Sequence, residues 1–392
     1  MQVGGGEGAS NALFIDTYYF WLIAIGAIVV LRLMTDARTR QYACAGLNLV
    51  FLVFVLGKQI AWLLAAGAVL FFLYRAYRRS SLRLTLTLII ATAGSALFVA
   101  YKSAFFTHVP GEAWIQQLLA GIGFSFVFLR VIDLARSLQD GRYDPPGAEQ
   151  MVNYLLPFHM LAAGPIQAYD DFARQPGVPN PLTTRETLDA VQRVAGGLFK
   201  KFVLAYALQK VFLTDLQAPG LWFALEVQIL LLWLYLDFSA YSDIAVGLGH
   251  LMGVATPENF NRPWLARNLI EFWDRWHISL SQWIRRNLFI PIQLNLMRRY
   301  PRTDPVLIAS LAIGVSFFMA GIWHGFSRGW LLWGAMHAIG LVVVRLYTGW
   351  MQKNRTAEQI AAYRDNRLIL IATRALTIEY AAMAFAVVFM LK

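Results

Sequence analysis

The sequence has one cysteine and few charged residues. Cys44 has no second cysteine to pair with, which excludes an internal disulfide framework and a zinc site built from cysteines. Only 15% of the 392 residues are charged, whereas soluble domains carry about a quarter. This scarcity of charge argues against an ordinary soluble domain, a disordered chain and a coiled coil.

Apolar residues make up 58% of the chain, and the mean hydropathy is +0.51. They gather in blocks without Lys, Arg, Asp or Glu, such as residues 84–101 and 306–327. A bilayer core requires about 20 apolar residues per helix. The pattern therefore predicts an all-α polytopic membrane protein, with about 11 transmembrane or re-entrant helices.

The basic residues predict an orientation. Arginines cluster after the first, third and fifth apolar blocks, whereas the loops between them carry only Lys58 and Lys102. Basic residues are enriched in cytoplasmic loops, so we expect residues 1–16 to form a short lead outside the cytoplasm. Residues 17–392 are expected to form one membrane domain without a cleaved signal peptide. The net charge of +11 then reflects loop placement and predicts no nucleic-acid partner.

The stretch from residue 145 to residue 302 differs from the rest. Pro, Gly, Asn, Asp and Arg interrupt its apolar blocks. Irregular backbone at membrane depth is tolerated only where protein or a water-filled cavity surrounds it. We therefore expect plain outer helices and broken inner helices around a central tunnel.

His324 lies near the end of the apolar block 306–327, between Gly321 and Gly325. An ionisable side chain inside a membrane segment is costly and marks a candidate functional site. The two glycines would let another backbone or a substrate come close. The alternative is a neutral histidine that bonds to a neighbouring helix. In an enzyme, a neutral imidazole can accept the proton of an attacking hydroxyl.

His277 lies in a tryptophan-rich segment, residues 271–281. A helix here would place Trp273, Trp276, His277 and Leu280 on one face. Such a face suits a tunnel wall or an aromatic anchor at the membrane interface.

Two further histidines have simpler interpretations. His337 either buttresses His324 or bonds to a carbonyl, and His159 is interpreted as structural. No phosphate loop, dinucleotide-binding glycine pattern or His-x-x-x-His pair occurs, so no metal site is expected.

Basic residues bracket Ile290 and Pro291. They are Arg285, Arg286, Arg298, Arg299 and Arg302. They predict either a cytoplasmic anchor or a docking surface for an acidic partner.

At this point the sequence resembles the membrane-bound O-acyltransferase family. Four strings carry the resemblance: residues 161–166 (Leu-Ala-Ala-Gly-Pro-Ile), residues 237–249 (Asp-Phe-Ser-Ala-Tyr-Ser-Asp-Ile-Ala-Val-Gly-Leu-Gly), residues 258–281 from Glu-Asn-Phe-Asn-Arg-Pro-Trp to Trp-His-Ile-Ser-Leu-Ser, and residues 321–325 (Gly-Ile-Trp-His-Gly). They occur in the family's order and place the catalytic core at about 150–345.

The resemblance implies roles for particular residues. His324 matches the family's catalytic histidine, and His277 matches the second histidine of the bacterial members. The expected tunnel and substrate-binding residues are Trp273, Trp276, Ser279, Trp323, Ser242 and Asp243. The expected carrier-docking residues are Arg285, Arg286, Arg298 and Arg299.

Two bacterial branches follow from the resemblance, both in the inner (cytoplasmic) membrane. In one, D-alanine moves from the phosphopantetheine thioester of a cytoplasmic carrier protein to an extracytoplasmic polymer such as teichoic acid, or to an accessory protein. In the other, an alginate-type enzyme takes acetyl groups, from acetyl-CoA, for a periplasmic partner. The short chain, the segment Ile292-Gln293-Leu294 without Gly-Gly and the compact interval from His277 to His324 favour the first. The context of Pro291 favours the second.

One residue departs from the family pattern. Arg286 stands where the family often has an aspartate, which makes the local surface more basic. Arginine pairs well with carboxylate and phosphate, so this change favours an acidic carrier protein as partner. Two non-enzymatic alternatives stay open: a transporter, although the sequence shows no repeat symmetry, and a scaffold that recruits an acyltransferase.

Overall fold

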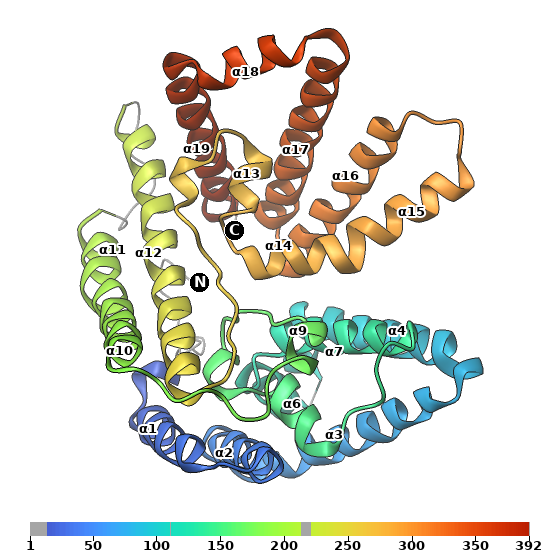
Figure 1. The fold of residues 1–392 in the computed structure, drawn as a ribbon, viewed down its shortest axis with the longest axis vertical. Coiled ribbons are helices and arrows are strands. Elements are labelled where there is room, and N and C mark those ends of the chain that lie inside the picture. Colours follow the sequence, from blue (N-terminus) through green and yellow to red (C-terminus); the bar gives the residue numbers. More distant parts are fainter. Residues whose placement is uncertain (1–13, 110, 213–220, 392) are drawn as a thin grey trace. The chain divides into compact units, whose positions relative to one another are not determined.

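The computed structural model describes residues 14–109, 111–212 and 221–391, and these residues fold as helices without a named strand (Figure 1). They divide into two compact units. Of the described residues, unit 1 contains 14–109, 111–199 and 240–257, and unit 2 contains 200–212, 221–239 and 258–391. The prediction of an all-α chain is confirmed. The single membrane domain stays a prediction, and most of the expected N-terminal lead lies outside the described residues.

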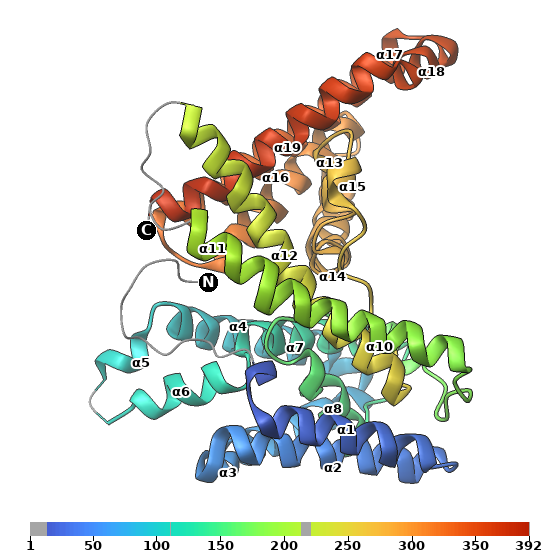
Figure 2. The same cartoon turned by 90° about the vertical axis from the view of Figure 1, so that its left-hand side faces the viewer.

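Unit 1 holds the first ten α-helices. They are α1 (Tyr18–Leu33), α2 (Ala37–Leu56), α3 (Ile60–Arg75), α4 (Arg83–Lys102), α5 (Phe105–His108), α6 (Ala113–Gly121), α7 (Phe124–Gln139), α8 (Ala148–Leu155), α9 (Tyr169–Ala173) and α10 (Thr184–Phe199). The helices α1 and α2 lie side by side in both ribbon views (Figures 1 and 2).

Unit 2 holds the remaining helices. They are α11 (Tyr206–Phe212), most of α12 (Leu221–Met252), α13 (Leu269–Trp273), α14 (Ile278–Ile284), α15 (Ile290–Arg299), α16 (Pro305–His324), α17 (Arg328–Asn354), α18 (Ala357–Asp365) and α19 (Arg367–Met390). The end of α12 belongs to unit 1. This helix is continuous through Asp237 and Asp243.

Six helical stretches among the described residues are long and apolar enough to cross a membrane. They are residues Ala37–Arg78, Ser80–Lys102, Phe223–Met252, Pro305–His324, Arg328–Asn354 and Arg367–Met390. The pair α6 and α7, bent by 70°, would add a seventh if it forms one span. The total of about 11 segments, the central tunnel and the orientation stay predictions.

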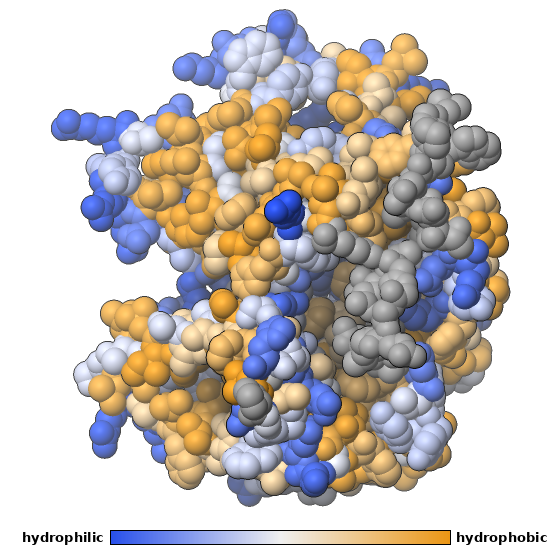
Figure 3. Space-filling view, turned by 180° about the vertical axis from the view of Figure 1, so that it is seen from behind, coloured by the Kyte–Doolittle hydropathy of each residue, from blue (hydrophilic) through white to orange (hydrophobic). Residues whose placement is uncertain are grey.

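The spanning helices leave much apolar surface uncovered by protein. In the stretch Ser80–Lys102 only 17% of the apolar window is buried. Phe72 of α3 and Leu368 of α19 are 70% and 79% exposed. Apolar residues gather in broad patches on the face shown in Figure 3. A large apolar side chain that stays in water loses about 1.5–3 kcal/mol of hydrophobic stabilisation relative to a buried one. These helices therefore require lipid around them.

Polar side chains fix where several helices begin. Asp36 accepts a hydrogen bond from the Thr39 backbone N–H at the start of α2 (2.7 Å). Asp304 does the same for Val306 at the start of α16, where Pro305 occupies the first turn. These caps satisfy backbone donors that the first turn leaves without a partner.

Arg130 of α7 organises the interior of unit 1. Its side chain is fully buried and donates hydrogen bonds to the carbonyls of Leu155, Met160 and Pro165. Leu155 ends α8, Met160 ends a short 3-10 helix (Phe158–Met160), and Pro165 lies in the non-helical chain that follows. A cation therefore supplies hydrogen bonds to carbonyls at the ends of two helices and in the chain after them.

Unit 2 is built around the pair α16 and α17. A Cβ atom at Gly321 would lie 2.9 Å from the Gly334 Cα and 2.7 Å from the Trp330 carbonyl oxygen. Only glycine permits this approach, as the sequence predicted for Gly321. The helices α13 and α19 pack against α17, which places a group of buried aromatic rings between these helices.

Candidate functional site

Most of the predicted site residues lie in unit 2. These are His324, His277, Trp273, Trp276, Ser279, Trp323, Arg285, Arg286, Arg298 and Arg299, whereas Ser242 and Asp243 belong to unit 1. The site is therefore described within unit 2.

His324 is the last residue of α16 and lies within a group of tryptophans. Its ring stacks on Trp330 with centroids 4.5 Å apart and an interplanar angle of 11°. Trp323 and Trp333 meet it edge-on, with centroids at 4.6 Å and 5.1 Å. Electron-rich indole faces favour a positively charged ring. This surrounding therefore suits a histidine that becomes an imidazolium during a reaction.

The short turn after α16 makes the stacking possible. A Cβ atom at Gly325 would lie 2.7 Å from Cδ1 of the Trp330 ring, so a larger residue would displace the indole. The Ser327 side chain caps the start of α17 by accepting from the Trp330 backbone N–H. Gly321 thus admits a neighbouring backbone, as expected, whereas Gly325 admits the ring of Trp330.

His277 is not inside a helix, and the predicted continuous helix over residues 271–281 is wrong. The helix α13 ends at Trp273, and α14 begins after His277, whose φ of 46° is left-handed. The chain instead runs beside residues 259–261: the Ile278 N–H donates to the Asn259 carbonyl, and the two segments form one isolated bridge. Tertiary hydrogen bonds have replaced helical ones. The predicted face is nevertheless buried, because Trp273, Trp276 and His277 are each 4% exposed.

Asn259 holds His277 in place, and the sequence interpretation missed this role. Its Oδ1 accepts from the Ser279 backbone N–H at 3.2 Å and the Ser279 hydroxyl at 2.8 Å. The His277 Nδ1 lies 3.1 Å from the same oxygen. Because Oδ1 is an acceptor, Nδ1 carries the hydrogen, and the neutral ring presents a lone pair at Nε2. Sequence analysis could have found this role only from a pairing between residues 259 and 277, and local periodicity does not reveal such a pairing.

Burial keeps the His277 ring neutral. Loss of hydration lowers the pKa of His277 to about 3. The Phe238 ring meets it edge-on with centroids 4.6 Å apart, and Phe260 packs on Phe238. A neutral imidazole in an apolar surrounding can accept a hydrogen bond at any pH near 7.

His337 of α17 is fully buried and accepts a hydrogen bond from a tryptophan. The Trp273 Nε1 donates to His337 Nδ1 at 3.3 Å, whereas the sequence predicted a bond to a carbonyl or a contact with His324. The rings of His337 and His324 both pack on Trp333. Aromatic contacts connect Trp276 through Phe272, Trp273 and Trp333 to His324.

The two predicted residues of unit 1 have structural partners there. The Arg193 side chain donates to Asp243 at 3.0 Å, and Ser242 is buried. In unit 2, Asp237 pairs with Lys201. These pairs indicate that the two aspartates hold neighbouring helices together.

The arginines lie along the chain from the end of α14 to the end of α15. Arg285, Arg298 and Arg299 are exposed, and Arg286 is half-buried. Burial raises the pKa of Asp274, while the charge of Arg285 opposes this shift. Three exposed guanidinium groups are thus available to an anionic partner.

The structure also bears on metal binding. Within residues 14–109, 111–212 and 221–391, no group of His, Cys, Asp and Glu is arranged to hold a metal ion.

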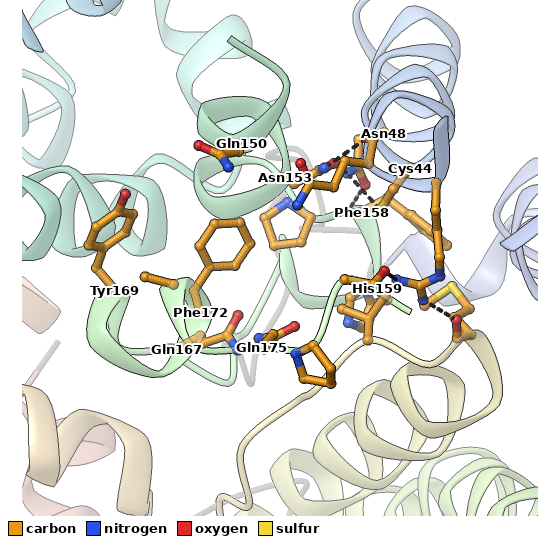
Figure 4. Close-up of a pocket in the computed structure, with 18 residues that line it drawn as sticks. Cys44, Asn48, Gln150, Asn153, Phe158, His159, Gln167, Tyr169, Phe172 and Gln175 are labelled. Atoms are coloured by element: carbon orange, nitrogen blue, oxygen red, sulfur yellow. Dashed lines mark hydrogen bonds between the residues drawn. The ribbon is translucent and has the colours of Figure 1, made fainter. Parts of the chain in front are cut away.

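Unit 1 contains a cavity that the sequence did not predict. Its volume is about 150 Å³, and its labelled lining includes Asn48, Asn153 and His159 (Figure 4). Asn153 accepts from Asn48 at 3.0 Å, and the His159 Nε2 lies 3.0 Å from the Thr256 hydroxyl. The lining side chains thus bond to one another, which supports the structural interpretation of His159.

Comparison with known proteins adds to this geometry. The sequence profile of the membrane-bound O-acyltransferase family matches residues 68–364. The teichoic acid D-alanyltransferase of Bacillus subtilis (strain 168) is 25% identical over 66% of this chain and 67% of its own length. That of Lacticaseibacillus rhamnosus is 26% identical over 86% of each chain. A probable alginate O-acetylase of Azotobacter vinelandii is 31% identical over 59% of this chain, but the match spans only 46% of the acetylase.

Proposed function

The chain belongs to the membrane-bound O-acyltransferase family, a family of O-acyltransferases, and from this premise we propose its reaction. It moves a D-alanyl group from a carrier-protein thioester on the cytoplasmic side to a hydroxyl outside the bacterial cytoplasmic membrane. The hydroxyl belongs to an envelope polymer or to an accessory protein. The observation that carries the proposal is His324, stacked on Trp330 at the end of a spanning helix. We choose D-alanyl as the acyl group because the relatives named above are D-alanyltransferases.

His324 acts as the general base. It accepts the proton of the acceptor hydroxyl as the oxygen attacks the thioester carbonyl, and it returns a proton to the leaving thiolate. The stacked Trp330 face stabilises the imidazolium formed between these steps. Positioned proton transfer of this kind contributes about 10²–10⁴-fold to the rate.

His277 orients a substrate group. With its Nδ1–H directed at Asn259, the neutral ring offers only an acceptor at Nε2. It can receive an amide N–H of the pantetheine arm, but it cannot donate to the thioester carbonyl. This hydrogen bond therefore favours a role in orienting the substrate over a role in polarising its carbonyl.

Tryptophans keep water away from the thioester. Trp273 and Trp276 are buried and Trp323 is half-buried. Indole walls exclude competing water and strengthen electrostatic interactions inside the site. Ser279 supports the same wall through its bonds to Asn259, whereas Ser242 and Asp243 stay predicted substrate-binding residues.

The basic segment receives the carrier protein. Carrier proteins are acidic, and arginine matches carboxylate and phosphate oxygens. We expect the change of Arg285 and Arg286 to Glu to weaken carrier binding at least tenfold at low salt, measured by pull-down or calorimetry in detergent. The same change at exposed Arg364 and Arg367 is the matched control. Carrier binding unaffected by the first pair would remove the docking assignment.

The direct experiment replaces His324 with Ala and follows acylation of the envelope polymer in membranes. Loss of about 10²-fold or more is expected at unchanged protein level. The exposed His108, changed to Ala, is the control. Wild-type acylation by the His324 variant would reject the catalytic role and favour a scaffold or a transporter.

A second candidate is transfer of acetyl from acetyl-CoA to a periplasmic partner, which the alginate O-acetylase relatives favour. Supplying purified protein with D-alanyl-carrier thioester and with acetyl-CoA separates the two. If the protein turns over acetyl-CoA and not the D-alanyl thioester, acetyl transfer is the function.

A further inference from the structure

Two donor-bearing side chains of α17 are buried with an unpaired nitrogen each. Trp333 and His337 are one turn apart, both are 0% exposed, and their ring centroids lie 4.7 Å apart. Within the part of the chain that the structure describes, Trp333 Nε1 and His337 Nε2 have no hydrogen-bond partner. Leaving such atoms unpaired costs about 1–3 kcal/mol each. Two of them in contacting rings therefore require a functional explanation.

The partner of His337 fixes its tautomer. An indole nitrogen can only donate, so the bond from Trp273 Nε1 makes His337 Nδ1 an acceptor. An imidazolium has no acceptor atom, and the ring must therefore be neutral with its hydrogen on Nε2. The unpaired atoms of His337 and Trp333 are thus both N–H donors, and both require an acceptor oxygen.

The donor pair lies beside the proposed general base. The Trp333 ring meets the His324 ring edge-on with centroids 5.1 Å apart. The other rings that contact Trp333 include Trp273 and Phe385, at 5.7 Å and 5.8 Å. Donors fixed in a dry aromatic surrounding act more strongly on developing charge than donors in water.

We propose that the Trp333 Nε1–H and His337 Nε2–H form an oxyanion-binding site for the acyl carbonyl oxygen; this inference rests on the proposed function. The acceptor hydroxyl oxygen attacks the carbonyl carbon, its proton passes to His324, and the carbonyl electron pair moves onto the oxygen held by the two donors. The carbonyl then re-forms, the C–S bond breaks, and the thiolate takes the proton from His324. The products are an ester and a free thiol.

This assignment predicts an effect on rate more than on affinity. The two donors are neutral, so they interact weakly with the uncharged carbonyl of the bound thioester. They interact more strongly when the oxygen becomes negative in the transition state. Removal of a donor should therefore lower kcat with little change in KM.

The first test is Trp333→Phe, which keeps an aromatic ring and removes the N–H. We expect kcat for acyl transfer from the carrier thioester to fall about 10²–10³-fold, with KM within about threefold. Trp350→Phe on the same helix, at a 49% exposed position, is the control and should retain wild-type kcat. His337→Leu is the second variant, with the same expected loss. His337→Gln keeps an acceptor and a donor and should regain part of the rate.

A second readout does not depend on turnover. The carbonyl stretch of a [1-¹³C]acyl thioester of phosphopantetheine, with acetyl and D-alanyl groups tested in turn, is measured when bound to the His324→Ala protein. Hydrogen bonds from the pair should lower this frequency, and adding Trp333→Phe should shift it back. If the carbonyl frequency does not change, and if folded Trp333→Phe and His337→Leu proteins keep the wild-type kcat, the oxyanion-binding site is overturned. The proposed function would not be affected by that result. Absence of wild-type turnover of either thioester would overturn the proposed function.

Discussion

Two groups of buried polar side chains, Arg40 and His159 in unit 1 and Trp333 and His337 in unit 2, differ in the hydrogen bonds that they make. In unit 1, buried Arg40 donates to the carbonyls of Leu31, Gly177, Met252 and Gly253. Buried His159 bonds to Thr256. In unit 2, the equally buried Trp333 and His337 each leave an N–H without a partner in the described chain.

The difference separates two uses of a buried polar group. Where carbonyls or hydroxyls surround the group, it replaces backbone hydrogen bonds and holds an irregular fold together. Where aromatic rings surround it, its hydrogen-bonding capacity is kept for another molecule, at a cost in stability. Substitutions in unit 1 should therefore affect folding first, and substitutions around His277 and His324 should affect rate first.

The largest effect is expected for Arg130→Met in unit 1. It removes the donor to the carbonyls of Leu155, Met160 and Pro165. Bonds from a charged donor contribute about 1.5–3 kcal/mol each, so roughly 3 kcal/mol or more of unfolding free energy should be lost. Thermal unfolding in detergent measures it, with Arg185→Met, at a side chain 92% exposed, as control. A variant as stable as wild type would remove the distinction between the units.

A smaller effect, on rate, is expected for Asn259→Ala in unit 2. The His277 ring loses the acceptor for its Nδ1–H, and misplacement of a positioning group by about 1 Å can cost 10²-fold. Asn259→Asp keeps the acceptor oxygen and should retain more activity. Its carboxylate should also raise the pKa of His277, which moves the acid limb of the pH–rate profile upward. Asn261→Ala, two residues away and exposed, is the control. Equal kcat for the two Asn259 variants would contradict the positioning role.

The smallest effect is a pH dependence of stability. Burial lowers the pKa of His277 to about 3, whereas an unfolded histidine has a pKa of about 6.5. Below pH 6.5 the unfolded chain binds a proton that the folded chain does not, so stability is full above pH 6.5 and declines as the pH falls toward 3. Between pH 7 and pH 5 this amounts to about 2 kcal/mol. The Tm of His277→Asn should therefore fall less over this interval than that of wild type. Parallel Tm curves would show that the folded His277 titrates normally.

Part of the fold and the site followed from the chain alone. Most of the block 306–327 lies in α16, and the block 84–101 lies in α4, because about 20 contiguous apolar residues favour a membrane helix. His324 could be singled out because an ionisable residue in such a block is rare. The glycines beside it could be assigned to close approach because they lack a Cβ atom.

Other features required partners distant in sequence. Local spacing predicted a helix through His277, but Asn259 draws that segment into a left-handed turn. Asp237 and Asp243 lie inside α12, where Lys201 and Arg193 pair with them, and local sequence does not identify these partners.

The sequence by itself determined that this is an all-helical membrane chain with an O-acyltransferase signature and a candidate histidine. Composition and spacing are local quantities, and they suffice for these conclusions. Only the tertiary structure decided which ring nitrogen of His277 and His337 carries the hydrogen. The tautomer depends on which donor or acceptor lies opposite, Asn259 for one and Trp273 for the other. These contacts join residues 18 and 64 positions apart, beyond the reach of any local pattern.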